Sequence, residues 1–406
     1  MPREKHLSIV HTHIHEAMYR ASSRRRPPIR LSRLRLLVSA SISLYLFCFT
    51  IFGTNNNWIR KPYAPLQTFI KLTKKLTWSL RRSSTDQAQL QIPRSQPVPD
   101  PDVPCIPGLP NIPAKIWQSA KSENLSMKQK AWSSTWLEKN PSFEHELVTD
   151  DTWNQYVEKK YGTIRPDIVS LFKGLQVAIL KADLLRYLIL LADGGIWSDI
   201  DATCAMPVAD WLPADANDVM FAGGNVTSHT PWSEGIGLIV GLEFDGEWEG
   251  EGSGLSSQLT NWVFAARPGS RHLQLVVDDI VRHLNDITLE NGVTAEGITL
   301  DMISDVVEVT GPWRMTLGIL ESLSCMLGRR VDERDFSRGK KPRVLGDVVI
   351  MPGNAFAAKQ NGYPTGQGPV LVTHHYEGSW KSLARQAKDR RRRKMMETEA
   401  RRKTAD

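Results

Sequence analysis

Two aspartates spaced two residues apart, Asp199 and Asp201, are the residues of this 406-residue chain best suited to chemistry. They belong to the run 196–201, which predicts a strand that emerges into a turn. Because side chains on a strand alternate between its faces, we expect both carboxylates to point the same way while Ile200 faces the core. Paired hard oxygen ligands suit Mn²⁺ or Mg²⁺, and such an ion would neutralise charge on a departing diphosphate. The motif therefore predicts a metal–diphosphate site.

The helix expected before this motif, at residues 176–192, carries Asp183, Arg186 and Tyr187. These three residues are spaced i, i+3 and i+4, so they share one face of the helix. Charged groups inside an apolar helix need partners. We expect Asp183, with Tyr187 beside it, to bind a nucleotide donor and Arg186 to reach the aspartates or the diphosphate. The alternative is an internal ion pair that only orders the helix.

From about residue 112 the chain alternates short strands and helices, which indicates an α/β fold with its ligand site at the carboxyl ends of strands. Strands are expected at 114–117, 144–148, 196–201, 219–222, 236–243, 344–350 and 369–373, and helices at 128–138, 176–192, 256–265, 271–284, 319–327 and 388–403.

The stretch KADLLRYLILLADGGIWSDIDATC, residues 181–204, resembles the signature of the fungal Och1-type family of α-mannosyltransferases, glycosyltransferase family 32. Residues 112–118, 310–312 and 374–381 resemble the family's opening strand, its TGP turn and its closing H-x-x-x-G-S-W motif, in the same order. The resemblance implies a GT-A fold, a Rossmann-like mixed sheet flanked by helices. It also implies retaining transfer of mannose from GDP-mannose, with Mn²⁺, to the N-glycan of a glycoprotein.

The resemblance also implies roles for single residues. It places Asp199 and Asp201 on the metal and the diphosphate, and Asp183 on the donor. His374 or His375 would complete the metal shell, and one of the two is expected to be only a polar strand end. Lys181 departs from the family, which usually has Arg there.

Two further candidates come with a structural alternative. Trp117 is a candidate to line the border of the donor pocket. The alternative is that it packs in the core. Asp245, with Glu243, is a candidate for orienting acceptor hydroxyls or for stabilising an oxocarbenium-like charge, and a solvated loop acid is the alternative.

The N-terminal part of the chain predicts a membrane anchor. Residues 1–33 are basic, and 34–53 form a mostly apolar run just long enough to span a bilayer. This order predicts a cytosolic tail and a signal anchor, with a cleaved signal peptide as the alternative. The proline-rich segment 54–104 is expected to be a stem, 105–385 the catalytic domain and 386–406 a basic tail.

This organisation, with the resemblance, predicts a type II Golgi protein with a luminal catalytic domain, in the company of other Golgi mannosyltransferases. The net charge of +7 comes mostly from the two chain ends, so it does not indicate a nucleic-acid surface. The cysteines after the anchor, Cys105, Cys204 and Cys325, allow one disulfide.

Three alternative functions remain open. The first is hexosyl transfer to a glycolipid such as inositol phosphorylceramide. The second is a phosphohydrolase of the haloacid dehalogenase type, because residues 199–203 fit its D-x-D-x-T motif. The third is a membrane-tethered binding protein without turnover.

Overall fold

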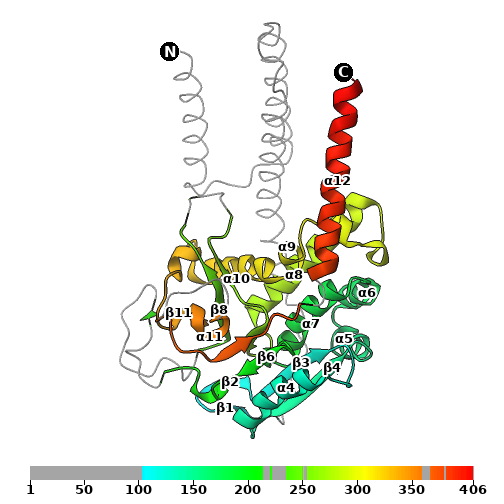
Figure 1. Cartoon of the computed structure of the whole chain (residues 1–406). Coiled ribbons are helices and arrows are strands. Elements are labelled where there is room, and N and C mark those ends of the chain that lie inside the picture. The colour runs from blue at the N-terminus through cyan, green and yellow to red at the C-terminus, as the bar shows by residue number, and fades with distance from the viewer. Residues whose placement is uncertain are drawn as a thin grey trace, which may run out of the picture. The chain divides into compact units, whose positions relative to one another are not determined.

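The computed structural model describes residues 103–213, 220–221, 235–248, 250, 254–358, 366–378 and 381–405 (Figure 1). All of them belong to one compact unit, Arg94–Asp406. Among these described residues, no helix is both long and apolar enough to cross a bilayer. The predicted cytosolic tail, the signal anchor and nearly all of the stem lie outside the described residues.

A mixed nine-stranded sheet forms the centre of the described unit. Its strands run in the order β4-β3-β5-β10-β8-β12-β11-β7, and β9 pairs with β8. β3 is parallel to both β4 and β5, whereas β10 is antiparallel to its two neighbours β5 and β8. The strands are β3 (Lys115–Ala120), β4 (Glu144–Thr149), β5 (Gly195–Ser198), β7 (Met220–Phe221), β8 (Leu238–Asp245), β9 (Ser257–Leu259), β10 (Val263–Ala266), β11 (Arg343–Leu345) and β12 (Val348–Met351).

Two smaller pairs of strands complete the β structure. β1 (Cys105–Ile106) pairs with β2 (Leu109–Pro113), and β6 (Ala202–Cys204) pairs with β13 (Val372–His374). The helices are α4 (Met127–Lys139), α5 (Trp153–Tyr161), α6 (Pro166–Gly174), α7 (Ala178–Ala192), α8 (Arg271–Asn291), α9 (Val306–Val309), α10 (Pro312–Leu327), α11 (Gly353–Ala357) and α12 (Lys381–Ala405).

The sheet is buried on both faces. Alternate strand residues enter different core clusters: Trp117 and Trp197 pack with the residues of α7, α8 and α10, whereas Ile116 and Ile196 pack with Trp136 of α4 and the residues of α11. A sheet covered on both sides carries apolar residues on both faces of its strands. The predicted α/β class is therefore confirmed.

The predicted helix at 256–265 is wrong. This segment forms β9 and β10, and β10 lies inside the sheet between β5 and β8. All four residues of β10 are buried, so the segment is apolar without alternation, and periodicity alone does not separate such a run from a buried helix. The single strand expected at 344–350 is likewise the hairpin β11–β12.

The end of α7 explains the Gly194-Gly195 pair. Both residues have positive φ, +68° and +97°, which glycine adopts at little cost. A Cβ on Gly195 would lie 2.5 Å from the carbonyl oxygen of Lys115 on β3. Glycine therefore lets the chain leave α7 and enter the sheet close beside β3.

The expected disulfide is not formed among the described cysteines. Cys105, Cys204 and Cys325 are all free, and Cys204 is buried.

Candidate active site

The two aspartates of the motif lie in the turn between β5 and β6, not on a strand. The backbone N–H of Asp199 donates to the carbonyl of Trp262 at 2.8 Å, and the N–H of Ala202 donates back to the carbonyl of Asp199 at 3.1 Å. Ile200 is half-buried, so the expectation that it faces the core is wrong. The turn, not strand alternation, therefore directs the two carboxylates.

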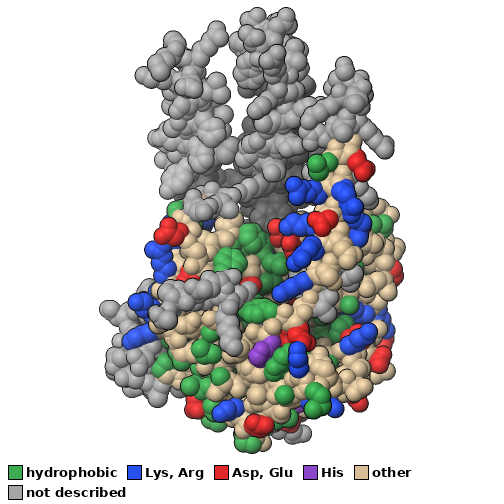
Figure 2. All heavy atoms as spheres, viewed as in Figure 1, with side chains coloured by type: hydrophobic (Ala, Val, Ile, Leu, Met, Phe, Trp, Pro, Cys, Tyr) green, Lys and Arg blue, Asp and Glu red, His purple; other side chains and the backbone are tan. Residues whose placement is uncertain are grey.

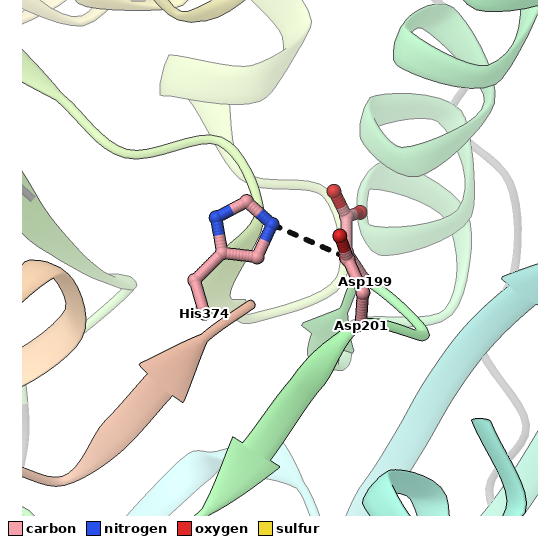
Figure 3. Close-up of side chains that lie close together, drawn as sticks. All are labelled: Asp199, Asp201 and His374. Atoms are coloured by element: carbon pink, nitrogen blue, oxygen red, sulfur yellow. Dashed lines mark hydrogen bonds and ion pairs between the residues drawn. The ribbon is translucent and has the colours of Figure 1, made fainter. Parts of the chain in front are cut away.

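A histidine from the far end of the chain meets this turn (Figure 3). β13 pairs with β6 in a register that sets His374 opposite Ala202. His374 Nε2 lies 3.1 Å from Asp201 Oδ1, and the backbone N–H of Glu377 donates to Asp201 Oδ2 at 2.9 Å. One ligand atom each from Asp199, Asp201 and His374 lie within 4.8 Å of one another.

This donor set fits a divalent cation. Two carboxylate oxygens and one imidazole nitrogen suit Mn²⁺, which accepts both kinds of ligand. Burial raises the pKa of Asp199, against the pull of Arg186, and the charge of Asp201 raises it further. Burial is the largest single effect on Asp201 and acts to raise its pKa, but the hydrogen bond and charge of His374 and the backbone N–H of Glu377 together outweigh it and lower that pKa. A cation between the two carboxylates would relieve their repulsion.

An aromatic wall holds the histidine ring in place. Trp262 stacks on His374 with ring centroids 4.7 Å apart, and Tyr376 contacts the same ring at 4.0 Å. The indole N–H of Trp262 donates to the carbonyl of Phe356 at 3.0 Å, which fixes the tryptophan. His374 Nδ1 is buried with no hydrogen-bond partner in the described structure, so stacking positions the ring and Nε2 faces the carboxylates.

The face of α7 that was predicted to bind the donor contacts the first aspartate of the motif through Arg186. Arg186 Nη1 is 3.2 Å from Asp199 Oδ1 and donates to the carbonyl of Asn261 at 2.7 Å, while its Nη2 is 3.1 Å from Asp183 Oδ1. Arg186 therefore reaches the motif, and it also forms the internal pair that was the alternative.

Asp183 is held by donors from three directions. Thr310 Oγ1 donates to its Oδ2 at 2.9 Å and the Asn261 side-chain amide donates to its Oδ1 at 3.2 Å, in addition to Arg186. Burial raises the pKa of Asp183 to about 6, and Arg186 and Thr310 oppose the rise. Tyr187 is fully buried in the same network and donates to the carbonyl of Thr310 at 3.1 Å.

Three predicted residues lie away from the cluster. Trp117 is 1% exposed, and its indole N–H donates to the carbonyl of Gly194, so it packs in the core and does not border a donor pocket. His375 stacks on Trp132 at 4.5 Å and is not among the three clustered ligands. The carboxylate of Asp245 accepts hydrogen bonds from Ser257 Oγ and the backbone N–H of Arg338, an engagement that the sequence did not indicate.

Sequence reasoning missed three residues that build the site. Trp197 donates its indole N–H to Asp199 Oδ1 at 2.8 Å, Asn261 binds Asp183, and Trp262 stacks on His374. Asn261 and Trp262 lie in the segment that was predicted as a helix, where their side chains would not have been expected beside the motif. The sequence could have indicated Trp197, because it is an aromatic residue two positions before the first aspartate.

Comparisons with known proteins agree with this geometry. Residues 126–218 match the family described as a glycosyltransferase sugar-binding region containing a DXD motif. The initiation-specific alpha-1,6-mannosyltransferase of Candida albicans is 26% identical over 298 residues, which cover 66% of this chain and 72% of that protein. The protein of the same name from Schizosaccharomyces pombe is 28% identical over 287 residues, covering 68% of this chain and 65% of that protein.

A solved structure titled PaToxG Glycosyltransferase aligns with a TM-score of 0.31 at 16% identity, covering 53% of this chain and 75% of that one, a likeness too low to carry an argument. The family match includes the two aspartates, Asp183 and Arg186, and neither the phosphohydrolase nor the binding-protein alternative is favoured. The chain is a glycosyltransferase with a DXD-containing sugar-binding region, and its sequence is similar to the two fungal initiation-specific alpha-1,6-mannosyltransferases.

Proposed function

We propose that this protein is a retaining mannosyltransferase of GT-A fold that transfers mannose from GDP-mannose to the N-glycan of a glycoprotein. The observation that carries the proposal is the convergence of Asp199, Asp201 and His374 at the end of β5, with Arg186 directly behind them. The similarity to two proteins named for α-1,6-mannosyl transfer supports the choice of sugar and of acceptor class.

The three clustered residues would hold Mn²⁺, which would supply positive charge against a diphosphate leaving group. Arg186 keeps one guanidinium nitrogen on Asp199, so it orients that carboxylate and adds a fixed positive charge beside the leaving group. Asp183, fastened by Asn261 and Thr310, holds Arg186 in that position.

The location belongs to the same proposal. The apolar run 34–53 after a basic segment supports a single-pass Golgi anchor with the described unit in the lumen. Tagging each end and testing its protection from protease in sealed Golgi vesicles checks the orientation. A C-terminus open to protease in intact vesicles would contradict it.

GDP release by the purified full-length chain tests the activity. We expect turnover with GDP-mannose, Mn²⁺ and an oligomannose glycan, and none when UDP-glucose or UDP-galactose replaces the donor. The product linkage, read by digestion with linkage-specific mannosidases, should be α-1,6. Turnover with UDP-sugars alone, or no turnover with any donor, would overturn the proposal. Transfer only to inositol phosphorylceramide would establish the glycolipid alternative.

A further inference from the structure

A cavity of about 400 Å³ lies between α12 and the loop that leads into α9. One wall is mostly apolar and comes from the 300–307 segment, with Leu300, Ile303, Val306 and Val307. The other wall is the side of α12, which contributes four cationic residues: Lys381, Arg385, Lys388 and Arg391. None of these residues belongs to the cluster of Asp199, Asp201 and His374.

The cationic wall is a property of one helix face. Lys381, Arg385 and Lys388 are spaced i, i+4 and i+7, so they follow one side of α12 over about 10 Å. Among the residues that line the cavity, Asp305 is the single acid, and its carboxylate already accepts the backbone N–H of Val307 as the cap of α9. Figure 2 shows Lys and Arg side chains gathered along the described part of this helix.

Two of the basic residues of α12 fasten it to the loop. The guanidinium of Arg391 donates to the carbonyls of Leu300, Ile303 and Ser304. Arg390 pairs with Asp301 at 3.1 Å. These contacts hold the helix beside the apolar wall, so the cavity is a feature of the folded unit.

The other cationic residues remain available to a ligand. Lys381 Nζ lies 5.3 Å from the centre of the Tyr376 ring, a contact that leaves its N–H groups open. The exposed side chains of Arg385 and Lys388 make no hydrogen bond or ion pair with any part of the chain that the structure describes. An excess of uncompensated positive charge beside an apolar surface suits an anion with an apolar or sugar-like body.

We propose that this cavity binds a phosphate ester, with its phosphate on Arg385 and Lys388 and its body against the apolar wall. Arginine and lysine together are the usual protein ligands of a phosphate group. Two sources share this chemistry: a soluble phosphate ester and the headgroup of an anionic phospholipid. Arg385 and Lys388 are not among the residues of the metal cluster, so we expect binding without a donor or a metal.

Binding of two probes to the full-length chain, with metal removed by chelation, tests the proposal. The probes are glycerol 3-phosphate and dihexanoyl phosphatidic acid, which carry the same phosphate without and with short acyl chains. We expect saturable binding, followed by calorimetry, of at least one probe. The double variant Arg385→Ser, Lys388→Ser should weaken it by about tenfold or more, because each charged hydrogen bond contributes roughly that factor.

The matched control is Arg392→Ser, Arg393→Ser, which removes the same charge from exposed positions of the same helix outside the cavity lining. We expect this control to keep its affinity within about twofold. Tighter binding of the acylated probe would identify a lipid phosphate as the ligand. Equal affinity for the two probes would identify a soluble phosphate ester. The proposal is overturned if neither probe binds saturably, or if both double variants lose affinity equally, which would show only diffuse attraction to a basic helix.

Discussion

Two helices, α7 and α8, each carry an aspartate and an arginine three residues apart, and the two pairs have different surroundings. On α7, Asp183 and Arg186 are 3.1 Å apart; on α8, Asp279 and Arg282 are 3.3 Å apart. The α8 aspartate meets a second arginine, Arg314 of α10, also at 3.1 Å. The α7 arginine instead meets a second acid of the site at 3.2 Å.

The difference lies in the sign of the excess charge. The α8 cluster has two arginines for one aspartate, so its excess charge is positive, and Arg282 lies exposed to solvent. The α7 cluster joins Asp183, Asp199 and Asp201 with one arginine, and its outermost part is partly exposed, with 24% of the Asp199 side chain open to solvent. An excess of acid at an accessible edge is what a cation-binding site requires, whereas a cluster with an excess of arginine repels a cation and serves the fold.

We expect the largest loss of activity from a substitution in the cluster of Asp199, Asp201 and His374. Asp201→Asn keeps the shape of the side chain but removes one anionic ligand, so we expect the turnover of GDP-mannose to fall by about 10²- to 10³-fold. Steady-state GDP release measures this loss. The free energy of unfolding should stay level, because the variant also removes repulsion from Asp199. Undiminished turnover would show that the cluster does not bind the metal.

For Asp279 of α8 we expect the reverse, a loss of stability with turnover retained. Asp279→Asn leaves the buried Arg314 short of its counter-charge, so we expect the free energy of unfolding to fall by about 3 kcal/mol. Denaturant titration measures this change. Turnover per folded molecule should stay within about twofold of the unaltered protein, since no contact links Asp279 to the metal cluster among the described residues. A large loss of turnover with unchanged stability would contradict the assignment of a purely structural role to the α8 cluster.

The α8 cluster should also respond to acid. Burial, and then the nearby charge of Arg314, lowers the pKa of His283 to about 4. The unfolded chain binds this proton near pH 6.5 and the folded chain does not, so stability is full above that pH and falls as the pH drops toward 4.

We expect this single histidine to account for on the order of 2 kcal/mol of the acid-dependent loss, reduced from the full shift because the ring keeps some contact with water. His283→Gln should lower the pH dependence of the unfolding free energy by that amount. Identical profiles for the variant and the unaltered chain would show that His283 titrates normally.

The smallest expected effect concerns the aromatic wall. Trp262→Phe keeps a ring against His374 but loses the hydrogen bond to the carbonyl of Phe356, which contributes about 1 kcal/mol. We expect the Mn²⁺ concentration for half-maximal activity to rise about threefold to tenfold, with little change in maximal turnover. A changed maximum at an unchanged Mn²⁺ requirement would point to a role on the donor instead.

The sequence predicted the chemistry of the site better than its geometry. The residue types and their order indicated a metal–diphosphate site, and the i, i+3 spacing put Asp183 and Arg186 on one face. The alternation argument for Asp199 and Asp201 was wrong because β5 ends before them. The residue at which a strand ends depends on its hydrogen-bonding partners. Here the backbone N–H of Asp199 donates to the carbonyl of Trp262, a contact that the local sequence pattern does not reveal.

The choice between His374 and His375 depended on long-range pairing in the same way. β13 ends at His374, and the next residue, His375, donates its backbone N–H to the carbonyl of Asp201 while its ring stacks on Trp132. The register of β13 on β6, segments about 170 residues apart, decides that His374 joins the cluster. The predicted helix at 256–265 failed for a related reason, because a central strand buried on both faces has no alternation to reveal it.

Manganese binding tests the central claim most directly. Full-length protein titrated with Mn²⁺ in the presence of GDP, followed by electron paramagnetic resonance, should show one bound ion per chain. We expect Asp201→Asn and His374→Ala to lose this ion at concentrations that saturate the unaltered protein, while Asp279→Asn binds it normally. Equal binding by all four proteins would contradict the assignment of Asp199, Asp201 and His374 as the metal site.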